Sequence, residues 1–196
     1  MIRLYGRRKT EQILADCRDQ IESLEARFGV PSAALLAILR QELPQIDLMD
    51  LLADQAVLLH WRMARLLGHP PRRGKQDSST GYAQVFAATA INSINFAADA
   101  GITDYKSLGL LTDHRLSREN PADLRMIWLM LHRDRNFNLL CAALTLLSAA
   151  REMTGRIDFA GYTSEEWQLI FTRYNANTHQ ITPYGREAYR HYTQAL

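Results

Sequence analysis

The stretch LLCAALTLLSAA, residues 139–150, is the longest apolar run of the chain and contains no charged residue. A helix that crosses a bilayer needs about 20 apolar residues in succession, so this run is too short to be one. It therefore predicts a buried core helix, and the rest of the chain is expected to fold around it.

Helical patterns lie on both sides of this run, whereas strand signals are scarce. On the N-terminal side, helices are predicted over residues 9–28, 31–43, 47–68 and 82–100. Glycines follow two of these segments and end a third, and a proline follows the other, all of which are typical of helix ends.

The core run belongs to a helical region that begins near residue 120 and has a charged interruption, HRDRN, at residues 132–136. Thr163 and Glu166 form a capping box ahead of a further helix, and a last helix is predicted over residues 183–194.

Two prolines, a glycine and several polar residues occupy residues 69–80, which therefore predict a loop or a short hairpin. We expect a mainly α single domain over residues 1–196, with about seven or eight helices and at most a small β-hairpin near residues 69–80.

Composition argues against several classes of function. The net charge of +2 is too small to indicate a nucleic-acid partner, although 20 of the 23 basic residues are arginines. Cys17 and Cys141 lack the spacing of metal ligands and are expected to be buried free thiols. The six histidines show no metal-binding pattern, so no metal or other cofactor is expected, and no segment predicts insertion into a membrane.

One acidic residue breaks the pattern of the second predicted helix. Leu35, Ile38 and Glu42 share one row of the helix, so the carboxylate projects from the core side. Burial would raise the pKa of that carboxyl toward the value that a general acid needs at neutral pH. Alternatively, Glu42 reaches water from the last turn before Pro44, and spacing does not choose between the two.

Four short motifs, in the same order, resemble those of the lysozyme-like superfamily, in particular goose-type lysozymes and soluble lytic transglycosylases. VPSAALLAILRQE (30–42) is similar to the helix that delivers the catalytic Glu in that family, and GYAQVFAATA (81–90) to its G-L-M-Q-L-M-P-A-T-A motif. NFNLLCAALTLL (136–147) resembles the family's N-I-x-x-G-x-x-Y-L helix, and RYNANTHQITPYGREAYRHY (173–192) its Y-N-A-G and Y-G-x-x-x-x-Y segments.

The sequence also departs from the family pattern. Leu43 stands where the family has a serine after the catalytic Glu, which leaves the hydrogen bonding around Glu42 open, and Asn177 replaces the last glycine of Y-N-A-G. Residues 1–29 form an N-terminal helix in this interpretation, and residues 44–80 an extra helix and loop inserted before the second motif.

The resemblance implies an enzyme that cleaves the β-1,4 bond between N-acetylmuramic acid and N-acetylglucosamine in peptidoglycan. Glu42 would protonate the glycosidic oxygen, and Gln84 would bind the sugar through its amide. Gly81 would let the backbone approach the saccharide, while Tyr174 and Asn175 would touch the substrate or the catalytic carboxyl. Without the resemblance, Tyr174 would be taken as a packed core residue and Asn175 as a helix end.

A hydrolase needs a second group to position water, whereas a lytic transglycosylase does not, because the sugar's own hydroxymethyl group attacks. Asp77, in the loop before Gly81, is predicted to hold that water, which favours hydrolysis. The alternative for Asp77 is a turn-forming residue that binds its own backbone. Asp47, Asp50 and Asp54 are explained by the start or the solvated face of the extra helix.

Two other interpretations remain: a module that binds peptidoglycan without cleaving it, and a basic helical nucleic-acid binder. Arg72, Arg73 and Lys75 form the clearest basic patch, either a solvated loop or a contact for peptidoglycan carboxylates.

The expected partners are peptidoglycan glycan strands and, for an antibacterial or phage-type lytic enzyme, a cognate inhibitor or immunity protein. We expect a monomer that binds neither nucleic acid nor membrane. Its place of action would be the periplasm or cell wall, and since no signal peptide is evident, export is expected through a dedicated secretion system, a holin or a larger parent protein.

Overall fold

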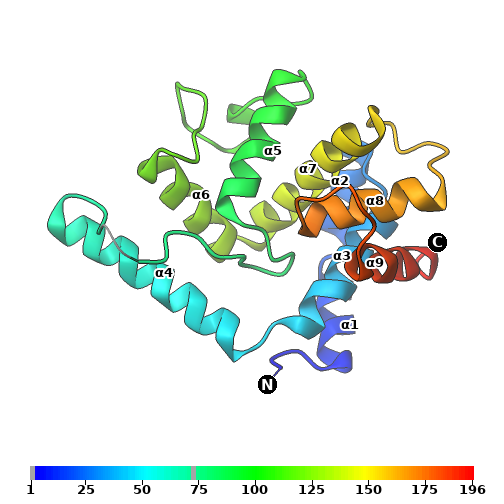
Figure 1. Cartoon of the computed structure of the whole chain (residues 1–196), viewed down its shortest axis with the longest axis horizontal. Helices are drawn as coiled ribbons and strands as arrows, with labels where there is room; N and C mark the ends of the chain where they lie inside the picture. Colours follow the sequence, from blue (N-terminus) through cyan, green and yellow to red (C-terminus); the bar gives the residue numbers. More distant parts are fainter. Residues whose placement is uncertain (1–2, 72–73) are drawn as a thin grey trace.

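The fold is built from helices, as the sequence predicts. The computed structural model describes residues 3–71 and 74–196, and nine α-helices lie within these ranges (Figure 1). Their bounds are α1 Arg7–Asp16, α2 Arg18–Phe28, α3 Ser32–Glu42, α4 Leu48–Leu67, α5 Ala87–Asp99, α6 Pro121–Arg133, α7 Arg135–Thr154, α8 Ser164–Asn175 and α9 Pro183–Thr193. Two short 3-10 turns, η1 Leu43–Gln45 and η2 Lys106–Leu108, are also present.

Strand pairing in the described part of the chain is limited to two isolated bridges, Arg3 with Asp47 and Thr80 with Val85. The hairpin that the sequence allows near residues 69–80 is thus only a single pairing at the end of that segment. None of the described helices is both long and apolar enough to cross a bilayer.

α7 is the core helix that the apolar run predicts. It packs most extensively against α5 and α8, and also against α6, α2 and α3 (Figure 1). Every residue of 139–150 is buried except Ser148, which is half-buried. Cys17 and Cys141 are both buried free thiols, as expected. The largest hydrophobic contribution to folding therefore comes from the surroundings of α7.

The last two helices hold α3 in place. α9 packs against both α8 and α3, although α3 lies near the other end of the sequence. Gly185 allows the close approach of α9 to α8, because a Cβ atom there would overlap the side chain of Thr172 and the carbonyl of Gln168. The start of α9 therefore lies beside the C-terminal end of α3.

Three predicted helix boundaries are wrong. The single helix expected over residues 9–28 is two helices that meet at Cys17, and no glycine or proline marks this break. The helix expected from residue 82 begins at Ala87, because residues 81–85 form a turn. The charged interruption at 132–136 is reduced to Asp134, whose carboxylate accepts hydrogen bonds from two amides at the start of α7.

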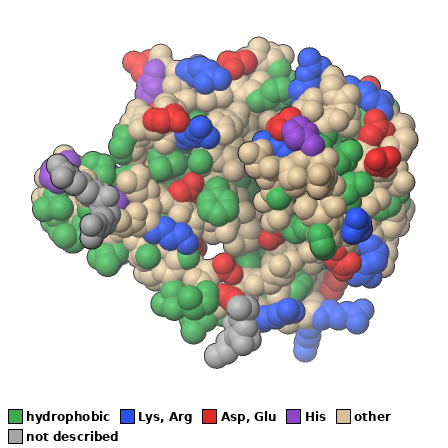
Figure 2. Space-filling model, viewed as in Figure 1, with side chains coloured by type: hydrophobic (Ala, Val, Ile, Leu, Met, Phe, Trp, Pro, Cys, Tyr) green, Lys and Arg blue, Asp and Glu red, His purple; other side chains and the backbone are tan. Residues whose placement is uncertain are grey.

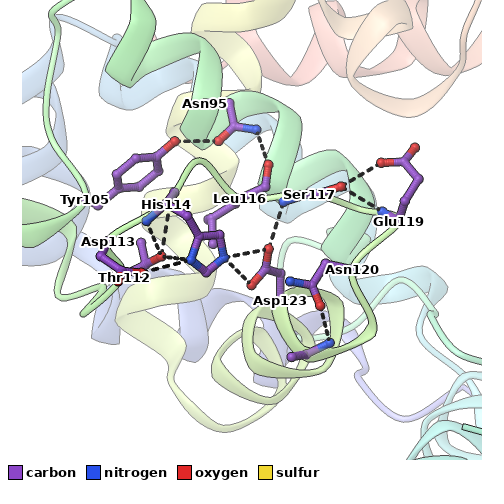
Figure 3. A network of polar contacts seen from close by, with 11 residues as sticks. Asn95, Tyr105, Thr112, Asp113, His114, Leu116, Ser117, Glu119, Asn120 and Asp123 are labelled. Atoms are coloured by element: carbon purple, nitrogen blue, oxygen red, sulfur yellow. Dashed lines mark hydrogen bonds and ion pairs between the residues drawn. The ribbon is translucent and has the colours of Figure 1, made fainter. Parts of the chain in front are cut away.

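A polar network fixes the long connection between α5 and α6 (Figure 3). Asn95 donates to the carbonyl of Leu116 (2.8 Å) and accepts from the Tyr105 hydroxyl (2.7 Å). The His114 ring lies 3.0 Å from the carboxylate of Asp123 on α6. The connection therefore needs no regular secondary structure to keep a defined path.

α4 begins and ends as predicted, with Asp47 as the N-cap and Gly68 in the left-handed conformation after its last turn. Only one side of this helix is buried, through Asp54, Val57, His60 and Trp61. In Figure 1 the helix lies along one edge of the molecule, and in Figure 2 hydrophobic side chains gather at that edge.

Candidate active site

A cavity of about 300 Å³ opens between the end of α3, the start of α4, the 79–86 loop and the end of α8. The space-filling view shows acidic side chains beside a hollow near the middle of this face (Figure 2). The described residues that line the cavity come from seven segments of the chain: Glu42, Gln45, Ile46, Asp47, Asp50, Ser79, Gln84, Val85, Phe86, Thr89, Thr145, Tyr174 and Asn175.

Four of the six predicted site residues lie together in this lining: Glu42, Gln84, Tyr174 and Asn175. They are separated by up to 133 positions in the sequence, and the fold brings them together in the wall of one cavity. Asp77 and Gly81, the other two, are not part of the lining.

Glu42 is the last residue of α3 and is only 8% exposed. The carboxylate therefore projects from the core side of the helix and lines the cavity. It does not reach open water from the last turn, which was the alternative from the sequence. Burial raises the pKa of the Glu42 carboxyl from 4.5 to about 7; the hydrogen bond from Tyr184 opposes this shift, and the charge of Asp50 adds to it. The raised pKa lets the Glu42 carboxyl hold a proton much closer to neutral pH than an exposed carboxyl does.

Tyr184 supplies the hydrogen bond that the sequence left open. Its hydroxyl donates to Oε1 of Glu42 at 2.5 Å. Leu43, which stands in place of the family's serine, is fully buried in the core and has no polar group to offer. The tyrosine on α9 therefore takes over the polar contact beside the carboxyl.

Tyr184 was not among the predicted site residues. The sequence does contain a signal for Tyr184: it is the first tyrosine of the Y-G-x-x-x-x-Y segment and directly follows a proline that starts a helix. Thr182 caps that helix by accepting a hydrogen bond from the Gly185 amide, which fixes the direction of the first turn.

The 79–86 loop is a tight turn held from several sides. Thr80 and Val85 exchange two backbone hydrogen bonds of 3.2 Å. Asn138 on α7, which is fully buried, donates to the carbonyl of Thr80 and accepts from the amide of Ala83, both at 2.9 Å. The protein itself supplies a hydrogen-bond partner for each of these backbone groups, so the shape of the loop is set before any ligand binds.

Gly81 serves this turn instead of the saccharide. Its φ is +72°, and a Cβ atom would overlap the side-chain amide of Asn138. From the sequence, Gly81 was expected to let a sugar approach the backbone. In the structure the missing side chain instead lets Asn138 approach the backbone.

Gln84 lies in the cavity wall in a left-handed backbone conformation, with φ of 48°. Its amide nitrogen donates to the carbonyl of Gly81 (2.9 Å), and its amide oxygen accepts from the Ser79 hydroxyl (3.1 Å). Both ends of the amide therefore stabilise the turn, and each retains capacity for one further hydrogen bond toward the cavity.

Tyr174 lines the cavity but does not donate to Glu42. Its hydroxyl donates to the carbonyl of Ala83 at 2.7 Å, so it positions the loop against α8. Burial, together with the nearby charge of Glu42, holds the pKa of Tyr174 well above its ordinary value. Asn175, the last residue of α8, is exposed at the rim, where its amide can reach a ligand.

The prediction that Asp77 lies in the cleft and holds a water molecule is not met. Its two carboxylate oxygens accept hydrogen bonds from the amides of Ala87 and Ala88, both at 3.0 Å. Asp77 therefore occupies the N-terminal end of α5, where a carboxylate satisfies unpaired amides and complements the helix dipole.

Asp47 and Asp50 are the other carboxylates in the cavity lining. They start α4 with a reciprocal capping box, which confirms the explanation from the sequence for these two residues. Asp47 is buried and its Oδ1 accepts from two amides, whereas Asp50 is half-buried and uses Oδ2 for the amide of Asp47. Asp50 therefore has one carboxylate oxygen outside the capping box.

Asp54 is not on a solvated face, contrary to the sequence interpretation. It is 7% exposed and accepts hydrogen bonds from the hydroxyls of Ser78 (2.7 Å) and Thr80 (2.8 Å). His132 lies 3.3 Å from the same carboxylate, and its ring stacks on Trp128. This cluster ties α4 and α6 to the base of the 79–86 loop.

A narrow polar groove continues from the cavity along α5 and α7. It shares Thr89 and Thr145 with the cavity and extends to Glu152 and Arg173, whose ion pair measures 2.7 Å. An elongated polar ligand could therefore lie partly in the cavity and partly along these helices.

No known protein family, characterised protein or solved structure matches this chain. Chemical interpretation of the site consequently rests on its own geometry and on the sequence motifs. Among the described residues, no three His, Cys, Asp or Glu side chains are arranged to hold a metal ion. Of the predicted basic patch, Lys75 is exposed, and Arg72 and Arg73 lie outside the described residues.

The cavity combines a buried acid with a raised pKa, a preformed loop and a polar opening that continues into a groove. Such an acid can donate a proton to the leaving group of a neutral polar substrate and later accept one. Glycosidic oxygens are poor leaving groups that require this protonation.

Proposed function

We propose that this protein cleaves the β-1,4 bond between N-acetylmuramic acid and N-acetylglucosamine in peptidoglycan, with Glu42 as the general acid. The observation that carries the proposal is the burial of Glu42 in an open polar cavity, with a pKa of about 7. The four motifs in the order of the lysozyme-like superfamily supply the substrate class.

In this mechanism the protonated Glu42 donates to the glycosidic oxygen while positive charge develops on the sugar ring. Tyr184 holds the carboxyl in one orientation before transfer and stabilises the carboxylate left afterwards. Asn175 and the polar edge of the 79–86 loop would bind the N-acetyl and hydroxyl groups of the sugar.

For hydrolysis, a water molecule must be activated on the other side of the sugar ring. Since Asp77 binds helix amides, the remaining cavity carboxylates are Asp47 and Asp50. Each keeps one oxygen outside the capping box, and Asp50 is the less buried of the two. We propose Asp50 in that role, in an antibacterial or phage-type muramidase.

A lytic transglycosylase is the second candidate. It is favoured by the capping-box role of Asp50, because a carboxylate that starts a helix has a structural reason to be in the cavity. In that case Glu42 alone would act as acid and then base, and the product would carry a 1,6-anhydro end. A module that binds peptidoglycan without cleaving it is the alternative in which neither carboxylate reacts.

The test is clearance of a purified peptidoglycan suspension by the wild type, Glu42→Gln and Asp50→Asn, with folding checked by circular dichroism. We expect clearance by the wild type and none by folded Glu42→Gln. Undiminished clearance by Glu42→Gln would refute the role of Glu42 as general acid. An inactive wild type would favour the alternative of a module that binds peptidoglycan without cleaving it.

Mass spectrometry of the released muropeptides separates the two reactions. Reducing ends, together with a loss of at least tenfold in Asp50→Asn, support hydrolysis with Asp50. Anhydro ends, with Asp50→Asn active, identify the transglycosylase.

The proposal includes the partners and place of action expected from the sequence: glycan strands, a cognate inhibitor or immunity protein, and activity in the periplasm or cell wall. Pull-down of an inhibitor encoded next to this protein, and its effect on peptidoglycan clearance, would test the second partner.

A further inference from the structure

The outward face of α4 is a continuous apolar surface. Eight residues of this helix lie within a sector of about 100° when successive residues are placed 100° apart. They are Leu48, Met49, Leu52, Ala56, Leu59, Met63, Leu66 and Leu67, hereafter the α4 stripe. All eight are exposed, the largest fraction being 79% at Leu66.

No charged side chain lies within the α4 stripe. The acidic residues of the helix, Asp50 and Asp54, point the other way, toward the cavity and the 79–86 loop. Arg62 lies beside the stripe, whereas Arg65 lies on another side of the helix, and both are exposed. The stripe runs the whole length of a 20-residue helix, which is about 30 Å.

The area of the α4 stripe fits a protein interface. Each large side chain exposes on the order of 100 Å², so the stripe amounts to several hundred Å², close to the ~800 Å² that each partner contributes to a stable interface. A patch of this size exceeds what isolated hydrophobic residues on a monomer's surface explain.

The order of residues in the α4 stripe identifies the partner. The stripe is symmetric about the midpoint between Val57 and Leu58, so that reversing the helix superimposes the same eight positions. In an antiparallel pair, Leu48 of one copy would face Leu67 of the other, and Leu52 would face Met63. At the centre Ala56 would face Leu59, a small residue opposite a large one, which allows the helices to approach closely.

From this self-complementarity we propose that two copies of the chain dimerise through α4, packed antiparallel about a two-fold axis at the midpoint of the helix. A two-fold interface requires one surface that is complementary to itself, and the α4 stripe has this property. The proposal replaces the monomer expected from the sequence and does not depend on the activity of the cavity.

A membrane surface fits the α4 stripe less well. Helices that lie on membranes combine an apolar face with a free, basic polar face and often place Trp or Phe at the boundary. The opposite face of α4 is buried in the protein instead, with Trp61 pointing inward. Asp50 lines the cavity from that inner face, so pairing through the stripe leaves the cavity of each copy open.

The first test is the mass of the full chain in solution, by sedimentation equilibrium or light scattering at concentrations up to about 100 µM, which detects any dimer with a Kd in the micromolar range or below. We expect twice the chain mass of 22.4 kDa for the wild type and the single mass for Leu59→Glu. Leu111→Glu is the matched control, since Leu111 is 94% exposed but lies outside α4, and it should remain dimeric. Circular dichroism establishes that each variant is folded.

The second test addresses the register. The double variant Leu48→Cys and Leu67→Cys should form intermolecular disulfides under mild oxidation, because its two sites are too far apart along one helix to pair within a chain. Leu48→Cys with Leu59→Cys places the thiols out of register and should not cross-link. Cys17 and Cys141 are buried and do not interfere.

Several results would overturn the proposal: a monomeric wild type, a dimer that Leu59→Glu leaves intact, or equal cross-linking of the two double variants. A monomer that sediments with vesicles of anionic phospholipid, and loses this binding in Leu59→Glu, would assign the α4 stripe to membranes instead.

Discussion

Replacing Glu42 by Gln should stabilise the folded protein above neutral pH. In the wild type, folding moves the pKa of this carboxyl from 4.5 to about 7, so the folded state binds the proton more tightly than the unfolded chain. Each pKa unit corresponds to 1.36 kcal/mol, and the full shift is therefore worth about 3 kcal/mol. Gln is neutral at every pH and can still accept the hydrogen bond from Tyr184.

The sign of the effect follows from proton binding. Below pH 4.5 the carboxyl is protonated in both states, and ionisation costs the folded protein nothing. Between pH 4.5 and 7 the unfolded chain releases the proton first, so the wild type loses stability as the pH rises. Above pH 7 the loss is complete, and Glu42→Gln should be more stable than the wild type by about 3 kcal/mol relative to their difference at pH 4.

Urea unfolding at a series of pH values from 4 to 8.5 measures this difference. Glu22→Gln serves as the matched control, because Glu22 is exposed on α2 and its replacement should follow the pH dependence of the wild type. A constant difference between Glu42→Gln and the wild type across this range would refute the burial of an ionisable Glu42, and with it the argument for a general acid.

Three further changes test the surroundings of the cavity. Tyr184→Phe removes the hydrogen bond that favours the Glu42 carboxylate, so the pKa of Glu42 should rise and the alkaline limb of the clearance activity should move up by on the order of one pH unit; an unmoved limb in a pH profile would contradict this. Gly81→Ala places a Cβ atom against Asn138 at a φ of +72°, and urea unfolding should show a loss of about 2 kcal/mol or more. Asp77→Asn should cost about 1 kcal/mol of stability through the start of α5 while peptidoglycan clearance persists. Loss of clearance at unchanged stability would return the water-holding role to Asp77.

Helical content and most helix ends could be predicted from the sequence, because glycines, prolines and capping residues act locally. Gly68 and Thr163 mark their boundaries in this way. The break at Cys17 could not be predicted, since its backbone turns without glycine or proline. The late start of α5 could not be predicted either, because the turn before it depends on Asn138, more than fifty residues further along the chain.

The candidate site could also be predicted only in part, because some of its contacts are local in the sequence and others are long-range. Glu42 shows an anomaly within its own helix, so the spacing singles it out as a candidate, although spacing alone does not decide whether it is buried. Tyr184 approaches it only because α9 packs against α3, a contact across 142 positions that no local pattern encodes. Asp77 was misplaced because sequence proximity to Gly81 does not reveal which way a loop carboxylate points, and the open amides of α5 are its nearest donors.

The enclosure of α7 also governs when this chain can fold during its synthesis. When residue 134 has been made, α5 and α6 can already pack against each other, but α5 still lacks α7, the helix against which it packs most extensively. α3 waits longer still, because its main neighbour, α9, follows α7 and α8 in the chain. Apolar faces of the nascent chain therefore stay partly uncovered until α7 and α9 have been made, and the cavity, which α3, α7 and α8 line together, cannot be complete before then.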